Sequence, residues 1–101
     1  MDSNKFRESL AGSAPPPESG PLLQALWHDA NGDWDRAHKL AQSQKDKAGA
    51  RVHAYLHRKE GDLDNAAYWY GRAGETMPET SLEQEWEALV TMLMAENPKK
   101  R

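Results

Sequence analysis

Two stretches of this sequence repeat the same pattern of residues 29 positions apart, and this repeat constrains the fold more than any other feature. Each stretch has an alanine and a histidine, then glycine followed by aspartate, then a large apolar residue and another alanine. Alanine lets two helices approach closely, and glycine allows the chain to turn between them. The pattern therefore predicts a helix–turn–helix hairpin that occurs twice. The matched positions are Ala25 and Ala54, His28 and His57, Gly32 and Gly61, Asp33 and Asp62, Trp34 and Leu63, and Ala37 and Ala66.

Apolar residues recur at spacings of three and four along most of the chain, which is typical of amphipathic helices. No segment shows the sustained alternation with period two that a half-buried strand requires. Ser81 with Gln84, or Thr80 with Glu83, offers a capping box at the start of the last periodic segment. We therefore predict an all-α chain with five helices. They cover about residues 20–30, 33–44, 48–60, 63–74 and 81–97.

The second repeat carries a longer pattern of small, glycine, large, alanine, aromatic, alanine and proline positions. These positions are Ala54, Gly61, Leu63, Ala66, Tyr70, Ala73 and Pro78. Over residues 47–78 the pattern resembles the tetratricopeptide repeat family. The first repeat matches in part, because Ala41 replaces the aromatic residue, and the offset of 29 residues is shorter than the family period of 34. About half of the chain also resembles a group of short uncharacterised bacterial proteins, a resemblance that implies no activity.

We expect residues 20–97 to form one tetratricopeptide-like domain, an α–α superhelix of two helical hairpins and a C-terminal capping helix. Two hairpins are fewer than the roughly three repeats that normally bury a solenoid core, so the last helix would complete that core. Residues 1–19 are polar and contain Pro15, Pro16 and Pro17, which lack backbone donors. We predict a disordered or extended N-terminal tail there, and a short basic tail over residues 98–101.

Composition excludes several classes of protein. The chain has 101 residues, a net charge of −3 and no cysteine, so it contains no disulfide and no thiolate ligand or nucleophile. No apolar run approaches the roughly 18 residues of a membrane span, and the N-terminus lacks the apolar core of a signal peptide. We therefore expect a cytoplasmic protein without a membrane partner. The negative charge argues against a large phosphate-binding surface for nucleic acid.

The resemblance to tetratricopeptide repeats implies a site for a partner. In that family the first helix of each hairpin lines a concave groove, which here would present Arg51, Tyr55, Arg58 and Lys59. This basic and aromatic surface suits a protein or an acidic peptide. Trp69 adds a second candidate surface, because Tyr68, Trp69 and Tyr70 are consecutive and cannot all face inward on one helix.

Histidines provide an alternative site. His53 and His57 are four residues apart on one helical face, which suits two ligands of one metal ion, and Glu60 follows three residues later. The pattern lacks the glutamate of the H-E-x-x-H motif, and we favour buried, hydrogen-bonded structural histidines over metal ligands as its explanation. The sequence also contains no nucleophile elbow and no phosphate-binding glycine loop.

We therefore expect a non-catalytic protein-interaction module or adaptor without a cofactor. The alternatives are a small metal- or ligand-binding protein, possibly an enzyme, that uses His53, His57 and Glu60, and a structural homodimer.

Overall fold

The computed structural model describes residues 2–96, and every regular element in that range is a helix. This confirms the predicted all-α fold class. No helix in the described range has the length and apolar character that crossing a membrane requires. The elements are α1 (Ser3–Glu8), the 3₁₀ turn η1 (Ser9–Ala11), α2 (Pro21–Ala30), α3 (Trp34–Gln42), α4 (Lys47–Glu60), α5 (Leu63–Arg72) and α6 (Leu82–Glu96).

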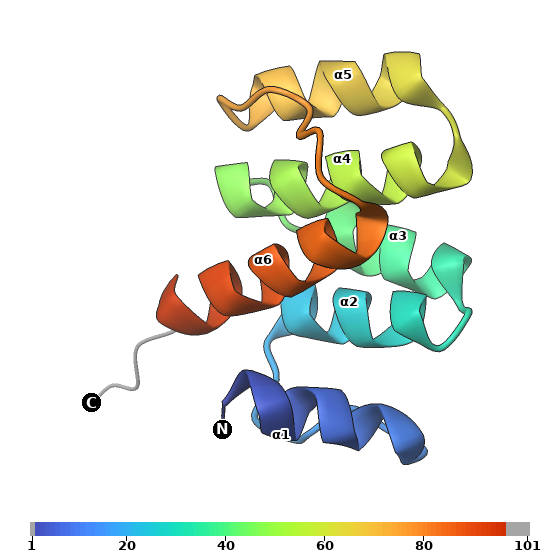
Figure 1. Cartoon of the computed structure of the whole chain (residues 1–101), viewed down its shortest axis with the longest axis vertical. Helices are drawn as coiled ribbons and strands as arrows, with labels where there is room; N and C mark the ends of the chain where they lie inside the picture. Colours follow the sequence, from blue (N-terminus) through green and yellow to red (C-terminus); the bar gives the residue numbers. More distant parts are fainter. Residues whose placement is uncertain (1, 97–101) are drawn as a thin grey trace.

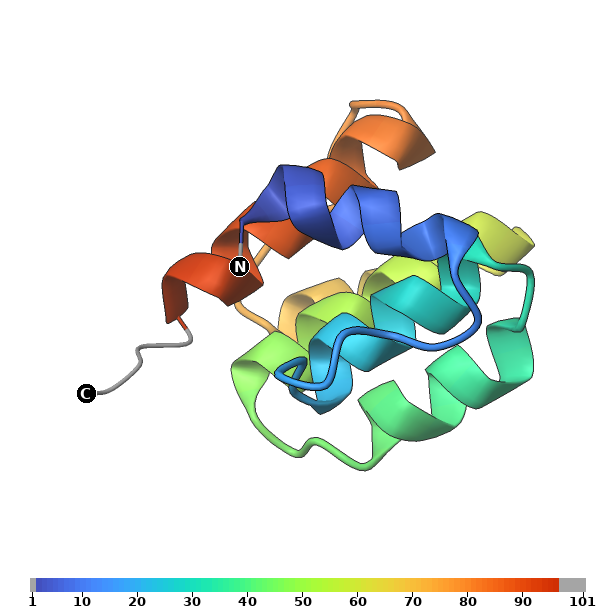
Figure 2. The same cartoon turned by 90° about the horizontal axis from the view of Figure 1, so that it is seen from below.

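The helices form two layers. Helices α2 and α3 pack as one hairpin, α4 and α5 pack as a second, and α3 against α4 joins the hairpins into a stack (Figure 1). Helix α6 crosses the face that α2 and α4 share, and α1 lies beside α6 on the same side of the stack (Figure 2). The predicted order of two hairpins followed by one further helix is therefore observed.

Aspartate side chains begin three of the four helices that make up the two hairpins. Each occupies the position before the first helical turn and accepts a hydrogen bond from a backbone N–H three residues later, which satisfies a donor that has no partner within the helix. The bonds join Asp33 to the Arg36 N–H at 3.2 Å, Asp46 to the Gly49 N–H at 2.9 Å, and Asp62 to the Asn65 N–H at 3.2 Å.

Two further local features predicted from the sequence are present in the structure: a capping box and the glycine turns of the hairpins. Ser81 and Gln84 form the predicted capping box, in which each backbone N–H donates to the other side chain at 3.1 Å. Gly32 and Gly61 follow the ends of α2 and α4 with φ of +86° and +92°. Glycine adopts this left-handed conformation without the steric cost that a Cβ would add. The turns inside both hairpins are therefore encoded locally.

The main core lies between the stacked hairpins and α6. Leu26 of α2, Leu56 of α4 and Leu89 of α6 are fully buried and meet there. Trp86 of α6 packs into the same cluster, and its indole N–H donates to the Leu26 carbonyl at 3.0 Å. The hydrogen bond satisfies the single polar atom of a large buried aromatic side chain. The apolar stripe of α6 thus completes the core.

The N-terminal segment differs from the sequence prediction. A disordered or extended tail was expected over residues 1–19, but residues 3–11 are helical and Phe6 is fully buried. Its ring centroid lies 6.0 Å from that of Trp86, and Arg7 pairs with Glu87 at 2.9 Å. One aromatic residue in a polar stretch was enough to dock the segment because α6 offers it an apolar surface. The predicted basic tail, residues 98–101, lies outside the described residues.

Helix α5 leaves large apolar side chains uncovered. Leu63 and Tyr68 are 54% and 55% exposed. Leu63 matches Trp34 in the repeat, but Trp34 packs towards the second hairpin and donates its indole N–H to the Leu56 carbonyl at 2.9 Å. Helix α5 is the outermost member of the stack (Figure 1), so no further hairpin within the described residues covers Leu63.

Candidate functional site

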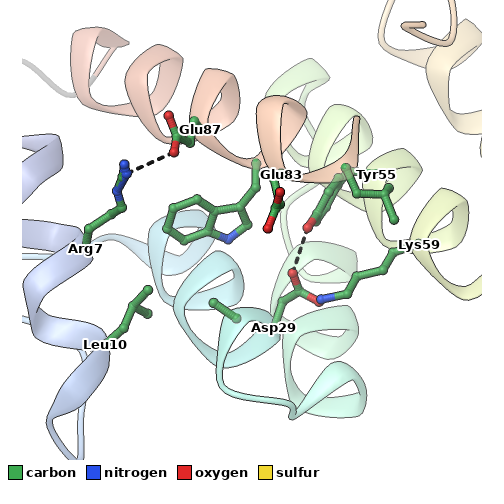
Figure 3. A pocket seen from close by; sticks show the side chains of 10 residues that line it. Arg7, Leu10, Asp29, Tyr55, Lys59, Glu83 and Glu87 are labelled. Carbon is green, nitrogen blue, oxygen red and sulfur yellow. Dashed lines mark hydrogen bonds and ion pairs between the residues drawn. The ribbon is translucent and has the colours of Figure 1, made fainter. Parts of the chain in front are cut away.

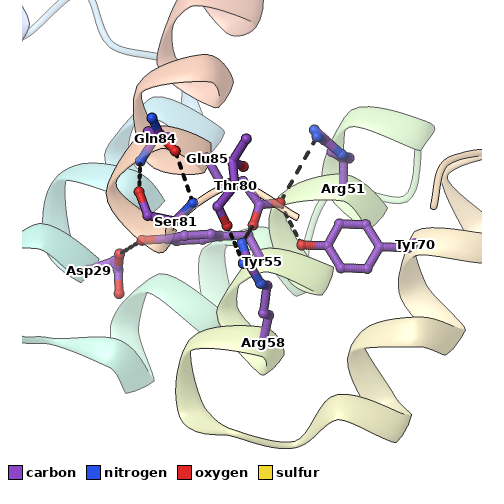
Figure 4. A network of polar contacts seen from close by, with 9 residues as sticks. All are labelled: Asp29, Arg51, Tyr55, Arg58, Tyr70, Thr80, Ser81, Gln84 and Glu85. Carbon is purple, nitrogen blue, oxygen red and sulfur yellow. Dashed lines mark hydrogen bonds and ion pairs between the residues drawn. The ribbon is translucent and has the colours of Figure 1, made fainter. Parts of the chain in front are cut away.

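Four of the predicted partner-binding residues lie on α4, and α6 already engages two of them, Arg51 and Arg58. Arg58 donates to Glu85 of α6 at 2.7 Å, and the nearest Arg51 nitrogen lies 4.0 Å from the other oxygen of that carboxylate (Figure 4). Glu85 is only 1% exposed, so its charge is neutralised inside the molecule by these two guanidinium groups. Arg58 also donates to the backbone carbonyl of Thr80, directly before α6. The basic face therefore holds α6 in place.

Two buried tyrosines extend this network. Tyr70 of α5 donates its hydroxyl to Glu85 at 2.5 Å, and Tyr55 of α4 donates to Asp29 of α2 at 3.0 Å. Burial raises the pKa of both phenols, and the neighbouring carboxylates raise it further. Lys59 pairs with the second oxygen of Asp29 at 3.0 Å. All four α4 residues thus have intramolecular partners, and a ligand that used Arg51 and Arg58 would have to displace Glu85 of α6.

A cavity of about 610 Å³ remains open between α1, α2, α4 and α6 (Figure 3). Its charged walls are largely compensated by the pairs Arg7–Glu87 and Lys59–Asp29. Apolar atoms come from side chains such as Leu10. With charges of both signs and apolar atoms on its walls, this cavity favours neither anionic nor cationic ligands.

Trp69, the fifth predicted partner-binding residue, belongs to a different site. Its ring stacks on the imidazole of His53 with the centroids 4.1 Å apart and the planes inclined by 20°. The side chain is half-buried. The aromatic residue that cannot face the main core therefore covers one of the histidines predicted to bind a metal.

The structure brings together three histidines, His38 of α3 and His53 and His57 of α4, which we call the histidine cluster. One ring nitrogen from each lies within 4.8 Å of the others. The Nε2 atoms of His38 and His53 are 2.9 Å apart, and the ring centroids of His53 and His57 are 4.8 Å apart. Three imidazoles that converge in this way resemble the donor set of a transition-metal site.

Helix geometry and helix packing each contribute to the histidine cluster. His53 and His57 are four residues apart, so both project from the side of α4 that faces α3. His38 comes from the middle of α3, one turn after Trp34. The Trp34 ring stacks on His38 with the centroids 4.8 Å apart and the planes inclined by 12°. Tryptophan rings thus cover imidazoles on both sides of the cluster, and they restrict the rotamers of those imidazoles.

Burial lowers the pKa of two imidazoles of the cluster, which favours their neutral form. His53 is 4% exposed, and desolvation lowers its pKa to about 4, with further lowering from His38, His57 and Lys45. Desolvation and the neighbouring His57 also lower the pKa of His38. Neutral imidazole is the form that binds metal ions.

Glu60 contacts the histidine cluster from outside. Its carboxylate lies 2.7 Å from Nδ1 of His57 and therefore holds the proton on that nitrogen. The other nitrogen, Nε2, is then free to act as an acceptor or ligand. The predicted set of His53, His57 and Glu60 is thus brought together in part, with Glu60 placed to orient His57. Glu60, His57 and Asp62 also form a second group with ligand atoms within 4.8 Å, but both carboxylates are exposed.

The sequence analysis did not identify His38. It does not lie at the family position of His28 and His57, and it forms no helical pair with another histidine. One signal was available: Trp34 and His38 are four residues apart, on a helix that a hairpin stack must pack against its neighbour.

Comparison of the chain with protein-family models, with curated protein sequences and with solved structures finds no match.

Proposed function

We propose that this protein binds a transition-metal ion through His38, His53 and His57. The observation that carries the proposal is the convergence of three imidazole nitrogens within 4.8 Å, contributed by two helices. Imidazole is a preferred ligand of Zn²⁺, Co²⁺, Ni²⁺ and Cu²⁺. We take Zn²⁺ as the reference ion, because it accepts three histidines with a water or other ligand in the fourth position.

The spacing of the nitrogens is close to what such an ion needs. Zn–N bonds of 2.0–2.1 Å in a tetrahedron place two ligand nitrogens about 3.3 Å apart. His38 and His53 are slightly closer than this, at 2.9 Å, and the third nitrogen lies within 4.8 Å. Side-chain rotations that shift ring nitrogens by about 1 Å would bring all three within bonding distance of one ion. The backbone of α3 and α4 would not have to move.

The surroundings favour a prearranged site. Glu60 hydrogen-bonds Nδ1 of His57, the arrangement by which carboxylates commonly orient metal-binding histidines. Trp34 covers the ring of His38 and Trp69 covers the ring of His53. Residues that hold ligand side chains in place reduce the entropy lost when the ion binds.

The test is a zinc titration of metal-free protein purified without a polyhistidine tag. Isothermal titration calorimetry should give one Zn²⁺ per chain with a dissociation constant of about 1 μM or tighter. His38→Gln should weaken binding at least about tenfold. His28→Gln is the matched control, because His28 lies on α2 outside the cluster, and it should leave the affinity unchanged. Zinc binding that is equal in wild type and His38→Gln would overturn the proposal.

The partner-binding groove of the sequence analysis stays a prediction, as does the homodimer. The groove hypothesis would require α6 to leave the face of α4, where Glu85 pairs with Arg51 and Arg58. No comparable rearrangement is needed for metal binding.

A further inference from the structure

A small basic cavity adjoins the histidine cluster. It has a volume of about 280 Å³ and lies between the α3–α4 connection and α5. Pockets for drug-sized ligands usually start near 300 Å³, so this cavity fits only a small ligand. His53 and Trp69 form part of its wall, and Lys45, Lys47 and Arg72 supply three positive charges.

These charges are not neutralised within the described part of the chain. No carboxylate in residues 2–95 lies within 4.0 Å of the charged nitrogens of Lys45, Lys47 or Arg72. The one acidic residue in the cavity wall, Asp46, uses an oxygen to cap α4 through the Gly49 N–H at 2.9 Å. The cavity therefore has an excess of positive charge in a confined space, which attracts a small anion.

His53 links this cavity to the histidine cluster. Its Nε2 lies 2.9 Å from Nε2 of His38, so this nitrogen belongs to the cluster. Its Nδ1 takes part in no hydrogen bond among residues 2–95, whereas Nδ1 of His57 contacts the Glu60 carboxylate at 2.7 Å. Metal-binding histidines almost always donate their second ring N–H to a carboxylate, a carbonyl or water. If His53 binds a metal ion through Nε2, its Nδ1–H therefore lacks an acceptor among the described residues, and His53 lies beside a cavity that attracts anions.

We propose that the cavity binds a small oxyanion, a carboxylate or a phosphate, which accepts the Nδ1–H of His53 while Lys45, Lys47 and Arg72 neutralise its charge. The inference rests on the proposed metal site: an ion on Nε2 keeps the proton on Nδ1 and makes that nitrogen a donor. Metal and oxyanion then bind cooperatively, and each raises the affinity of the other by the same factor.

The experiment is a nuclear magnetic resonance titration of ¹⁵N-labelled protein, metal-free and zinc-loaded. Sodium acetate and sodium phosphate are added separately at constant ionic strength, which separates a carboxylate ligand from a phosphate ligand. We expect saturable shifts of the Lys45 and Arg72 amides and of the Trp69 indole N–H. The affinity of the better anion should rise about fivefold or more when zinc is bound.

Two double variants test the assignment. Lys45→Gln with Arg72→Gln should weaken anion binding about tenfold while the protein still binds one Zn²⁺ per chain in anion-free buffer. Arg36→Gln with Lys39→Gln removes the same charge from exposed positions of α3 and should change neither anion binding nor zinc binding. Zinc binding without saturable anion shifts, or anion binding that survives Lys45→Gln with Arg72→Gln, overturns this inference alone. Anion binding by a protein that binds no zinc overturns the proposed function and the coupling but supports the anion site.

Discussion

The Nε2 atoms of His38 and His53 lie 2.9 Å apart, although the residues are 15 positions apart in sequence and belong to different helices. Two ring nitrogens at this distance need one proton between them, or one metal ion in place of that proton. Trp34 and Trp69 cover the two rings from outside, so the pair is held in a largely desolvated position. This contact is the centre of the candidate site.

Glu60→Gln should weaken zinc binding about tenfold to a hundredfold without abolishing it. The substitution keeps a side chain of the same size but removes the carboxylate that holds the proton on Nδ1 of His57. The affinity is measured by competition with a coloured chelator. Glu79→Gln makes the same charge change at an exposed position away from the histidine cluster and should have no effect. An equal loss in both variants would mean that overall charge, not orientation of His57, sets the affinity.

Glu85→Ala should lower the free energy of unfolding by about 3–5 kcal/mol, because it leaves Arg58 and Arg51 beside Tyr70 without their buried counter-charge. Urea denaturation followed by circular dichroism measures the change. Glu83→Ala alters an exposed glutamate of the same helix and should stay within about 0.5 kcal/mol of wild type. A small effect of Glu85→Ala would show that the network around Glu85 contributes little to holding α6.

The metal-free protein should lose stability as the pH falls from about 6.5 to about 4. Burial lowers the pKa of His53 from 6.5 to about 4 in the folded state, so the unfolded chain takes up the proton first and is favoured in that range. The contribution of neutral, buried His53 to the free energy of unfolding is fully present above pH 6.5. By pH 4 the free energy of unfolding has fallen by on the order of 3 kcal/mol. Carboxylates also titrate there, so the unfolding free energy is compared between wild type and His53→Phe. The phenyl ring keeps the bulk, and the variant should show a shallower acid dependence; equal slopes would contradict the assignment to His53.

Gly61→Ala and Gly71→Ala should change stability in opposite directions. Gly61 has φ of +92° and open space around it, so an added methyl group is opposed by the backbone conformation alone, at about 1–2 kcal/mol. Gly71 lies inside α5, also with open space, and alanine there should stabilise the protein by about 0.5–1 kcal/mol. Thermal denaturation of the two variants checks both signs. Stabilisation by Gly61→Ala would contradict the left-handed turn after α4.

Much of the fold could be predicted because its determinants are local. The helices of both hairpins, the capping box of Ser81 and Gln84, and the turns at Gly32 and Gly61 follow from residues a few positions apart. The pairing of His53 with His57 is of the same kind, since one helical turn separates them. Hydrogen bonds within a turn and the 3.6-residue period act inside a single helix, so no knowledge of the rest of the chain is needed.

Other features of the protein depended on which helix surfaces pack against each other in the folded chain. Arg51 and Arg58 were predicted to bind a partner, and they bind Glu85, because the apolar stripe of α6 buries itself on the face of α4 that those residues flank. Phe6 docked a segment expected to be disordered because α6 offered it Trp86.

The sequence by itself determined where most of the helices lie, how they begin and turn, and that two histidines share one face of α4. Only the tertiary structure decided that His38 joins them, that Glu60 orients one of them and that a basic cavity opens beside the other. The physical reason is that local hydrogen bonds specify a helix, whereas burial of apolar surface between distant segments chooses which side chains become neighbours.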